Sequence, residues 1–192
     1  MKIELIIIIS YFLGSIPFGF LLTKIFLKKD IRSIGSGNIG ATNVLRTGNK
    51  RIGYTTLILD ILKAIVPLIF IKIYYIEYLY ISSLSIFLGH VFPIWLKFKG
   101  GKGVATYIGL LCCINLYLGI IFGVVWLITF LIFKYSSLSS LTASLSIQIF
   151  NYFIFNDEIV FFFIIMFVLI FFTHRENIKR LLNHTESKTK IY

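Results

Sequence analysis

Charged residues are scarce in this sequence, and acidic residues are the scarcest of them. Only 14% of the 192 residues are charged, with 8 Asp and Glu against 19 Lys and Arg. A soluble domain carries about 25% charged residues, so the composition excludes an ordinary soluble protein. The hydrophobic share of 58% and the mean hydropathy of +0.91 predict a polytopic membrane protein. We expect an all-α fold in one transmembrane domain, residues 1–184, followed by a short, disordered polar tail, residues 185–192.

The chain also lacks the sequence patterns of metal-dependent and hydrolytic chemistry. Its two cysteines, Cys112 and Cys113, are adjacent, which makes them poor disulfide partners, and no His or Asp lies at metal-ligand spacing from them. There is no Gly-x-Ser-x-Gly elbow, no cluster of aspartates, and no aspartate five residues after His90 or His174. We therefore expect no metal and no cofactor, and a site that works through positioning and electrostatics.

Long apolar runs separate short basic segments. A helix needs about 20 apolar residues to cross a bilayer, and the candidate runs are 4–27, 54–76, 78–96, 104–133, 137–155 and 159–173. The last of these is short, with fifteen residues, but rich in aromatic residues. The first run has no small-residue cleavage site, so we interpret it as a retained span and not as a signal peptide. The run 104–133 is too long for one span and short for two.

The topology follows from charge parity, by which we mean that successive loops alternate between the two sides of the membrane and the basic ones lie on the cytoplasmic side. The segment 28–53 holds six basic residues and one acidic residue, which places it on the cytoplasmic side. If 104–133 crosses twice, turning near Asn115, then residues 97–102 and 175–190 lie on that side as well. We therefore predict seven transmembrane helices, with the N-terminus outside and the C-terminus cytoplasmic. This topology accounts for most of the net charge of +11, so we expect no nucleic-acid partner.

Two glycine-rich basic loops carry the strongest functional signal. Glycines allow backbone N–H groups to converge, and convergent N–H groups beside a cation bind anions such as phosphate. The first loop contains Gly35, Ser36, Gly37, Asn38, Gly40, Thr42, Asn43 and Arg46. The second contains Gly100, Gly101, Lys102 and Gly103 and opens a helix at Val104, whose N-terminus favours negative charge. The alternatives are a flexible loop for the first and a turn with a topology-setting lysine for the second.

The first loop also matches the glycine spacing of dinucleotide-binding proteins, but no strand precedes it and no βαβ unit fits. Other polar residues lie within or next to the apolar runs. Pro17 predicts a kink in the first span, with a cavity-lining role for its neighbours as the alternative. Asp60 and Lys63 share one helix face as a structural ion pair or as functional charges. For His90 we favour a scaffolding role over proton transfer.

The last apolar run leads directly into a basic segment that contains His174, Arg175 and Asn177. An ordinary stop-transfer flank needs basic residues but neither histidine nor asparagine. We therefore expect His174 and Asn177, which share a helix face, to act on the substrate.

Taken in order, these motifs resemble the bacterial membrane acyl-phosphate:glycerol-3-phosphate acyltransferases. The resemblance covers nearly the whole chain and rests on residues 14–19, 35–50, 60–63, 89–93, 100–106 and 174–181. It departs from the family pattern at Ala64 and His184, where glycines are usual, and at Thr173, where a basic residue is common.

The resemblance implies a seven-helix enzyme in the bacterial cytoplasmic (inner) membrane, with its active site on the cytoplasmic side. The expected reaction moves a fatty acyl group from acyl phosphate to the 1-hydroxyl of sn-glycerol 3-phosphate, giving lysophosphatidic acid and phosphate. This is the first step of phospholipid biosynthesis. The family's phosphate-binding residues map onto Ser36, Asn38, Asn43, Arg46, Lys102, His174 and Asn177. We expect a monomer that contacts membrane lipid.

In this interpretation Arg46, Lys102 and His174 are catalytic. Arg46 and Lys102 neutralise the substrate phosphates, and either His174 or a substrate phosphate oxygen takes the hydroxyl proton. We favour the phosphate oxygen. Three other functions stay open on the sequence: a transporter of phosphorylated metabolites, a structural membrane subunit and a CoA-dependent acyltransferase.

Overall fold

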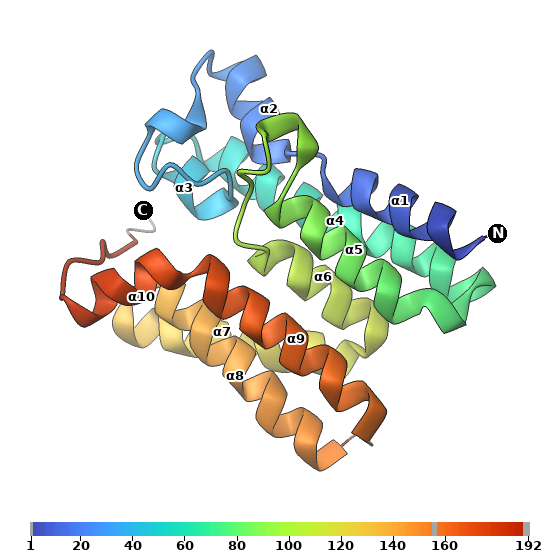
Figure 1. Cartoon of the computed structure of the whole chain (residues 1–192). Coiled ribbons are helices and arrows are strands. Elements are labelled where there is room, and N and C mark those ends of the chain that lie inside the picture. The colour runs from blue at the N-terminus through green and yellow to red at the C-terminus, as the bar shows by residue number, and fades with distance from the viewer. Residues whose placement is uncertain (1, 155–156, 190–192) are drawn as a thin grey trace. The chain divides into compact units, whose positions relative to one another are not determined.

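The computed structural model describes residues 2–154 and 157–189. Throughout these ranges the chain forms helices joined by loops, without a strand, which confirms the all-α prediction for them. The contacts divide the chain into two compact units, Met1–Ile114 and Asn115–Tyr192 (Figure 1). The boundary between the units falls at the turn that charge parity predicts within the long apolar run.

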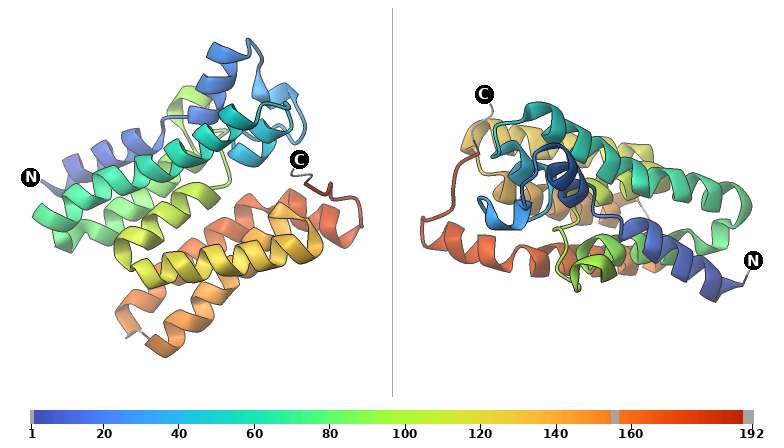
Figure 2. Two further views of the ribbon diagram at one scale, coloured as in Figure 1. Left: turned by 180° about the vertical axis from the view of Figure 1, so that it is seen from behind. Right: turned by 90° about the horizontal axis from the view of Figure 1, so that it is seen from above.

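The first unit is organised around one long helix. Helix α4 contacts every other α-helix of its unit. It runs along the unit (Figures 1 and 2). Short 3-10 turns lie at Ile31–Ser33, Ile76–Tyr78 and Ile94–Leu96. The α-helices are α1 (Ile3–Gly14), α2 (Phe18–Phe26), α3 (Ala41–Leu45), α4 (Lys50–Tyr74), α5 (Leu79–Val91) and α6 (Val104–Ile114).

The first apolar run is broken and not merely bent. Helix α1 ends at Gly14 and α2 begins at Phe18, with Pro17 between them (Figure 1). Proline has no N–H to donate, so the helical ladder cannot continue through this point. The predicted disruption at Pro17 is confirmed, and the break leaves the carbonyl oxygen of Ile16 available to a partner from outside the helix.

Helices α1 and α5 touch through their backbones. A Cβ atom on Gly14 would collide with the main chain of Ile86, and one on Gly89 would collide with the carbonyl oxygen of Tyr11. The Tyr11 hydroxyl donates to the carbonyl oxygen of Phe92 over 2.6 Å. The two glycines are therefore required by close packing, which small residues permit between membrane helices.

The second unit is a bundle of four helices in which α8 packs against both α7 and α9, and the short α10 contacts α8 and α9. Asn115 begins the unit in an extended conformation, and its side chain accepts from the N–H of Tyr117 over 2.9 Å, capping α7. The predicted break near Asn115 is confirmed. The helices are α7 (Leu116–Phe133), α8 (Ser136–Ile154), α9 (Asp157–Thr173) and α10 (Arg175–Leu182).

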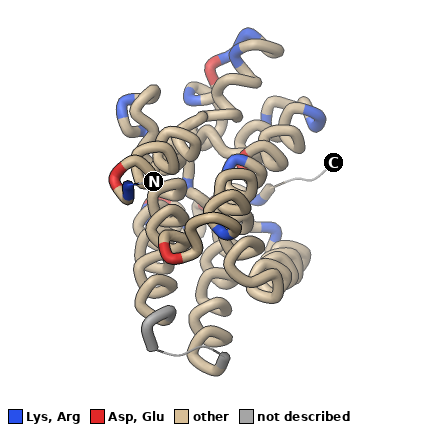
Figure 3. Tube along the Cα trace, turned by 90° about the vertical axis from the view of Figure 1, so that its right-hand side faces the viewer, with Lys and Arg blue, Asp and Glu red and all other residues tan. Residues whose placement is uncertain are grey.

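Some of the helical stretches in the described residues are long and apolar enough to span a membrane. Three stretches are long and apolar enough to cross a bilayer: Ile3–Phe26, Ile76–Leu96 and Leu116–Phe133. A fourth is the pair Val160–Thr173 and Arg175–Leu182, bent by 61°. Figure 3 shows long helical segments without charged residues, as integral membrane helices require. The exact number of seven spans stays a prediction, as does the single domain over residues 1–184. Residues 155 and 190–192 of the predicted elements lie outside the described ranges.

Candidate active site

The first glycine-rich loop packs against the turn that leads into the second one. Ile31, just before the first loop, Ile39 and Val44 within it, and Leu96 from the turn Ile94–Leu96 are all buried in one small hydrophobic cluster. Phe20, Ile34 and Ile52 pack against it. These apolar residues therefore hold the first loop against the turn from which the chain enters the second loop.

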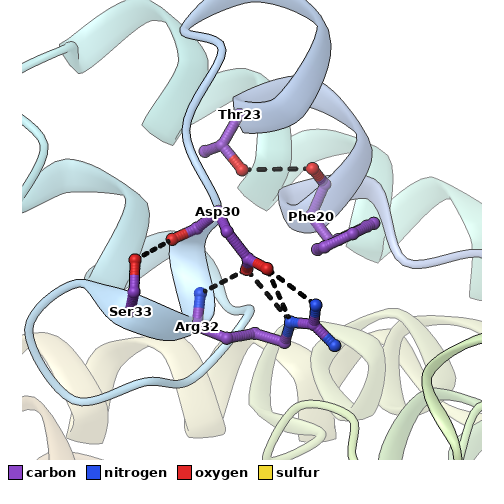
Figure 4. A network of polar contacts seen from close by, with 5 residues as sticks. All are labelled: Phe20, Thr23, Asp30, Arg32 and Ser33. Atoms are coloured by element: carbon purple, nitrogen blue, oxygen red, sulfur yellow. Dashed lines mark hydrogen bonds and ion pairs between the residues drawn. The ribbon is translucent and has the colours of Figure 1, made fainter.

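An ion pair fixes the start of the first loop. The Asp30 carboxylate accepts from Nε and Nη2 of Arg32, with a shortest distance of 2.7 Å, and caps the following turn through the Arg32 N–H (Figure 4). The guanidinium also lies over the Phe20 ring, 4.9 Å from its centroid. The Arg32 hydrogen bonds lower the pKa of Asp30 to about 2, so the carboxylate is charged at neutral pH.

Asn43 is the central side chain of the first loop. It is buried, and its Oδ1 accepts from the N–H of Ser36 over 2.9 Å. Its Nδ2 donates to the carbonyl oxygens of Ile31, Ile34 and Asn38, at 3.2, 2.9 and 2.8 Å. Both ends of the amide are therefore used inside the loop. This arrangement makes Asn43 a residue that shapes the site, whereas the sequence predicted that it contacts the substrate.

The backbone N–H groups of the first loop point inward. Those of Ser36, Gly37 and Gly40 donate to Asn43 Oδ1, the Ile34 carbonyl and Asn38 Oδ1. The predicted convergence of these N–H groups on an outside anion is therefore wrong. The reason is that the bends of the loop, with positive φ at Gly35 and Gly37, are closed by internal hydrogen bonds.

Arg46 lies against this loop. A Cβ atom on Gly35 would crowd the Asn43 amide and the Arg46 side chain, so glycine allows both side chains to approach the main chain. Arg46 and Ser36 are exposed, in contrast to the buried Asn43. The first loop therefore presents a guanidinium and a hydroxyl to its surroundings on a rigid internal frame.

The second loop folds back onto the end of α5. The N–H groups of Gly100 and Gly101 donate to the carbonyl oxygens of Val91 and His90 over 3.0 and 3.1 Å. These bonds satisfy carbonyl groups that the end of a helix leaves without partners. The two N–H groups are thus committed to the protein and take no part in the predicted phosphate cradle. The part of that prediction that rests on the N-terminus of α6 and on the Lys102 ammonium stays a prediction.

Close packing explains the glycines of the second loop. A Cβ atom on Gly101 would collide with Nε2 of His90, and one on Gly103, which has φ +84°, would collide with the Phe87 ring. Lys102, half-buried, lies between these two positions and directly before α6. The glycines hold the loop flat on α5, and this fixes the backbone from which the Lys102 side chain extends.

Below the second loop lies a group of buried polar side chains. The Lys63 ammonium contacts Oδ1 of Asp60, Nδ1 of His90 and the carbonyl oxygen of Ile16, each at 2.8 Å. The contacts with His90 and Ile16 are hydrogen bonds, and the contact with Asp60 is a buried ion pair. The same lysine therefore joins α4, the break between α1 and α2, and the histidine under Gly101. This is the structural ion pair that the sequence left open for Asp60 and Lys63, and it gives His90 the favoured scaffolding position.

In the second unit, His174 lies where α9 passes into α10. The residue is buried, and its Nδ1 lies 2.8 Å from the carbonyl oxygen of Ile170. A carbonyl oxygen can only accept, so Nδ1 carries the proton and the lone pair of the neutral ring is on Nε2. This tautomer makes Nε2 the atom through which His174 can accept a proton or a hydrogen bond.

The segment after α10 is anchored, whereas the sequence predicted a disordered tail. Glu186 accepts from Ser137 Oγ, Asn177 Nδ2 and Arg180 Nε, at 2.8, 2.7 and 2.7 Å. The N–H of Thr189 donates to the carbonyl oxygen of Lys134 over 2.8 Å. The sequence signal for this anchor is weak, namely one acidic residue in a basic tail.

The predicted site residues thus fall into two groups. The first unit carries both glycine loops, the first of them packed against the turn that leads into the second, and the second unit holds His174 and Asn177 on neighbouring turns. Arg46, Ser36 and Gly37 are exposed; Asn38, Gly40, Thr42, Gly100 and Lys102 are half-buried; Asn43, Gly101, Gly103, His174 and Asn177 are buried. Sequence reasoning missed Asp30, Arg32 and Glu186.

Comparison with known proteins gives concordant matches over the whole chain. Residues 4–184 match the family model described as glycerol-3-phosphate acyltransferase. A protein of that name from Pelagibacter ubique is 65% identical over 192 residues, which is 100% of each chain.

Two solved structures are also similar. The crystal structure of PlsY (YgiH), an integral membrane glycerol 3-phosphate acyltransferase, in its glycerol 3-phosphate form has a TM-score of 0.90 and 39% identity. The match covers 98% of this chain and 96% of that one. The lysophosphatidic acid form of PlsY has a TM-score of 0.87 and 38% identity, over 97% and 94% of the two chains. The loops, the helices that carry them and the extent of these matches together place this chain in the glycerol-3-phosphate acyltransferase family.

Proposed function

We propose that this protein transfers a fatty acyl group from acyl phosphate to the 1-hydroxyl of sn-glycerol 3-phosphate. The products are lysophosphatidic acid and inorganic phosphate. The observation that carries the proposal is the similarity to PlsY over 98% of the chain, because the PlsY structures are described as glycerol 3-phosphate and lysophosphatidic acid forms. The choice of acyl phosphate as donor rests on the sequence resemblance.

The chemistry asks for charge neutralisation and alignment. The hydroxyl oxygen attacks the carbonyl carbon of the acyl phosphate, the bond from that carbon to the phosphate oxygen breaks, and the hydroxyl proton passes to a base. Both substrates carry phosphate, so they repel each other unless cations lie between them. Arg46 extends from the first loop, which packs against the turn that leads into the second loop and its Lys102, and this supports the two residues as the phosphate-binding cations. Lys102 is proposed to stabilise the departing phosphate.

The other site residues are divided into those that contact substrate and those that act through the shape of the loops. Ser36, Asn38 and Thr42 are proposed to contact substrate from the first loop, and Asn43 to act through that loop's shape. Gly37, Gly40, Gly100, Gly101 and Gly103 are proposed to serve binding through close packing and backbone conformation. His174 either binds a substrate oxygen or takes the hydroxyl proton through Nε2, and we favour binding, with a substrate phosphate oxygen as base.

The test uses purified protein in lipid, supplied with glycerol 3-phosphate and either palmitoyl phosphate or palmitoyl-CoA. We expect phosphate release and lysophosphatidate only with palmitoyl phosphate, and a loss of about 100-fold or more in Arg46→Ala and Lys102→Ala. Arg51→Ala and Lys99→Ala, which remove exposed basic residues near the same loops, are the matched controls. Turnover with palmitoyl-CoA contradicts the proposed donor. No turnover of either by folded protein contradicts the enzymatic function and makes transport into sealed vesicles the next measurement.

The role of His174 is tested by kinetics. His174→Ala is expected to raise KM for glycerol 3-phosphate and to keep the acidic limb of the pH–rate profile. Loss of that limb with an unchanged KM identifies His174 as the base instead.

We also propose seven spans in the bacterial cytoplasmic membrane, with the N-terminus outside, the loops cytoplasmic and the protein a monomer. Single cysteines placed at Glu77 and Lys99, after replacement of Cys112 and Cys113 by serine, test the orientation. An impermeant thiol reagent added to intact cells is expected to label position 77 and not position 99, and the reverse pattern overturns the topology.

A further inference from the structure

Asn177 is held at one end of its amide group only. The side chain is buried, with 4% of its surface exposed, and Nδ2 donates to Oε1 of Glu186 over 2.7 Å. Its Oδ1 is buried and has no hydrogen-bond partner among the residues that the structure describes. A buried acceptor without a partner is costly, so such an atom commonly marks the place where a ligand or a water molecule binds.

Glu186 determines which atom of the Asn177 amide is left without a hydrogen-bond partner. Its carboxylate also accepts from Ser137 Oγ at 2.8 Å and from Arg180 Nε at 2.7 Å. Burial raises the pKa of this carboxyl group, but the hydrogen bonds from Arg180, Asn177 and Ser137 lower it by more, so the pKa is below its usual value. An ionised carboxylate can only accept hydrogen bonds. Rotation of the Asn177 amide by 180° would turn Oδ1 toward this negative charge. Repulsion between the amide oxygen and the carboxylate therefore fixes the observed orientation.

The substrate group that meets Oδ1 must therefore be a donor. A phosphate monoester is mostly a dianion at neutral pH and offers acceptor oxygens, which the Oδ1 atom repels. Glycerol 3-phosphate has two donors, its C1 and C2 hydroxyl groups. The single proton of the C1 hydroxyl has to reach a base during acyl transfer, and an amide oxygen is not a base at neutral pH. The C2 hydroxyl keeps its proton throughout the reaction and is the group suited to Oδ1.

We infer that Asn177 Oδ1 accepts a hydrogen bond from the C2 hydroxyl of glycerol 3-phosphate, and that Glu186 is the positioning residue that holds the amide in this orientation. The inference rests on the proposed function. It assigns Asn177 to the glycerol part of the substrate, whereas the sequence resemblance assigns it to phosphate. It also gives the tail segment a part in substrate choice, because Glu186 acts through Asn177 without touching the substrate.

The experiment compares glycerol 3-phosphate with 3-hydroxypropyl phosphate, which keeps the phosphate and the reacting hydroxyl but lacks the C2 hydroxyl. Each is offered with palmitoyl phosphate, and the ratio of the two kcat/KM values is measured. The unmodified protein is expected to prefer glycerol 3-phosphate by about tenfold or more, because the deoxy analogue leaves Oδ1 without a partner. In Asn177→Ala the ratio is expected to fall close to 1, since the variant lacks the acceptor and retains the Glu186–Arg180 pair that anchors the tail.

Two further variants separate positioning from folding. Glu186→Ala frees the amide to rotate, so the ratio is expected to fall in this variant too. The segment keeps its backbone anchors, because the Arg180 carbonyl oxygen accepts from the N–H groups of residues 185 and 186 and the Thr189 N–H donates to Lys134. Asn183→Ala removes an exposed asparagine at the end of the same helix and is expected to keep the ratio of the unmodified protein. Size-exclusion chromatography in detergent establishes that each variant is folded before its ratio is measured.

The outcomes distinguish this inference from the function on which it rests. Turnover of glycerol 3-phosphate with the same ratio in Asn177→Ala as in the unmodified protein overturns the inference and leaves the proposed function intact. An unchanged ratio in Glu186→Ala overturns the positioning role. Absence of turnover in the unmodified protein overturns the proposed function and the inference with it.

Discussion

The Lys63 ammonium donates a hydrogen bond to Nδ1 of His90 over 2.8 Å, so the histidine ring has to accept at this atom. A ring that accepts at Nδ1 is neutral and carries its proton on Nε2. Nε2 lies directly under Gly101, so close that a Cβ atom there would collide with it. The protonation of one buried residue is thereby connected with the backbone course of the second glycine loop.

Loss of Lys63 is expected to destabilise the protein strongly. Lys63→Met leaves the Asp60 carboxylate, whose side chain is 3% exposed, without its 2.8 Å partner. Breaking a buried ion pair by removing one member costs about 3 to 5 kcal/mol of unfolding free energy. Denaturation in detergent measures the change. The double variant Asp60→Asn/Lys63→Met is expected to recover most of the loss, because it leaves no buried charge. Equal destabilisation in both variants would show that the pair has another role.

A methyl group on Gly101 is expected to damage the site, and the chain offers a matched control. Gly101→Ala places a carbon against Nε2 of His90, whereas a Cβ atom on Gly123 meets nothing within 4 Å. We expect Gly101→Ala to lose about 1 to 3 kcal/mol of stability together with most activity. Gly123→Ala, within α7, is expected to keep activity and to gain up to about 1 kcal/mol. Thermal unfolding and turnover of palmitoyl phosphate are the measurements, and equal behaviour of the two variants contradicts the packing role.

Removal of the Asn43 side chain tests whether this residue shapes the loop or contacts the substrate. Asn43→Ala deletes four hydrogen bonds and leaves buried carbonyl groups without donors. A loss of about 3 kcal/mol is expected, against about 1 kcal/mol for Asn49→Ala, which deletes the single cap bond of α4. If Asn43→Ala retains its melting temperature and loses activity alone, the substrate contact predicted from the sequence is correct and the scaffolding role is not.

The anchored tail is expected to loosen in acid. The folded-state pKa of Glu186 lies below the ordinary glutamate value of 4.5. Its contribution to stability is therefore complete above pH 4.5 and is lost as the pH falls through the folded-state pKa. The protection of the Thr189 N–H, which is bonded to Lys134, against hydrogen exchange, measured relative to the rate of an unstructured amide at the same pH, is expected to fall in that range. Glu186→Gln removes this pH dependence, while Glu176→Gln, at an exposed position of α10, keeps it. Protection that stays the same as the pH falls through the folded-state pKa contradicts the anchor.

His184 bears a backbone strain that glycine would relieve. It adopts φ +56°, in the left-handed region, at the turn that leads the chain from α10 back to Glu186. The sequence resemblance places a glycine here, and a side chain in this conformation costs about 1 kcal/mol. His184→Gly is therefore expected to raise the unfolding free energy by about this amount, and His184→Ala to leave it within a few tenths. Thermal unfolding of the two variants checks the difference.

The sequence predicts the helical framework of this protein better than it predicts the hydrogen bonds of its loops. The break at Pro17 follows from a missing N–H, which acts locally. The break near Asn115 follows from the distribution of basic segments along the whole chain, which is also visible in the sequence. The direction of the Ser36 and Gly101 N–H groups depends on Asn43 and on the end of α5, so it follows only from the folded chain. The same holds for Glu186, whose partners Ser137 and Arg180 come from two different helices.

The contact of α1 with α5 through Gly14 and Gly89 has a mechanical consequence. Each helix leads into part of the candidate site: α1 through the Pro17 break, where the Ile16 carbonyl meets Lys63, and α5 through His90 into the second loop. Backbone atoms in contact have no rotamers to change, unlike long side chains. The spacing between these two parts of the site is therefore set by main-chain contact, and we expect it to change little when temperature or lipid composition alters the lateral pressure of the bilayer.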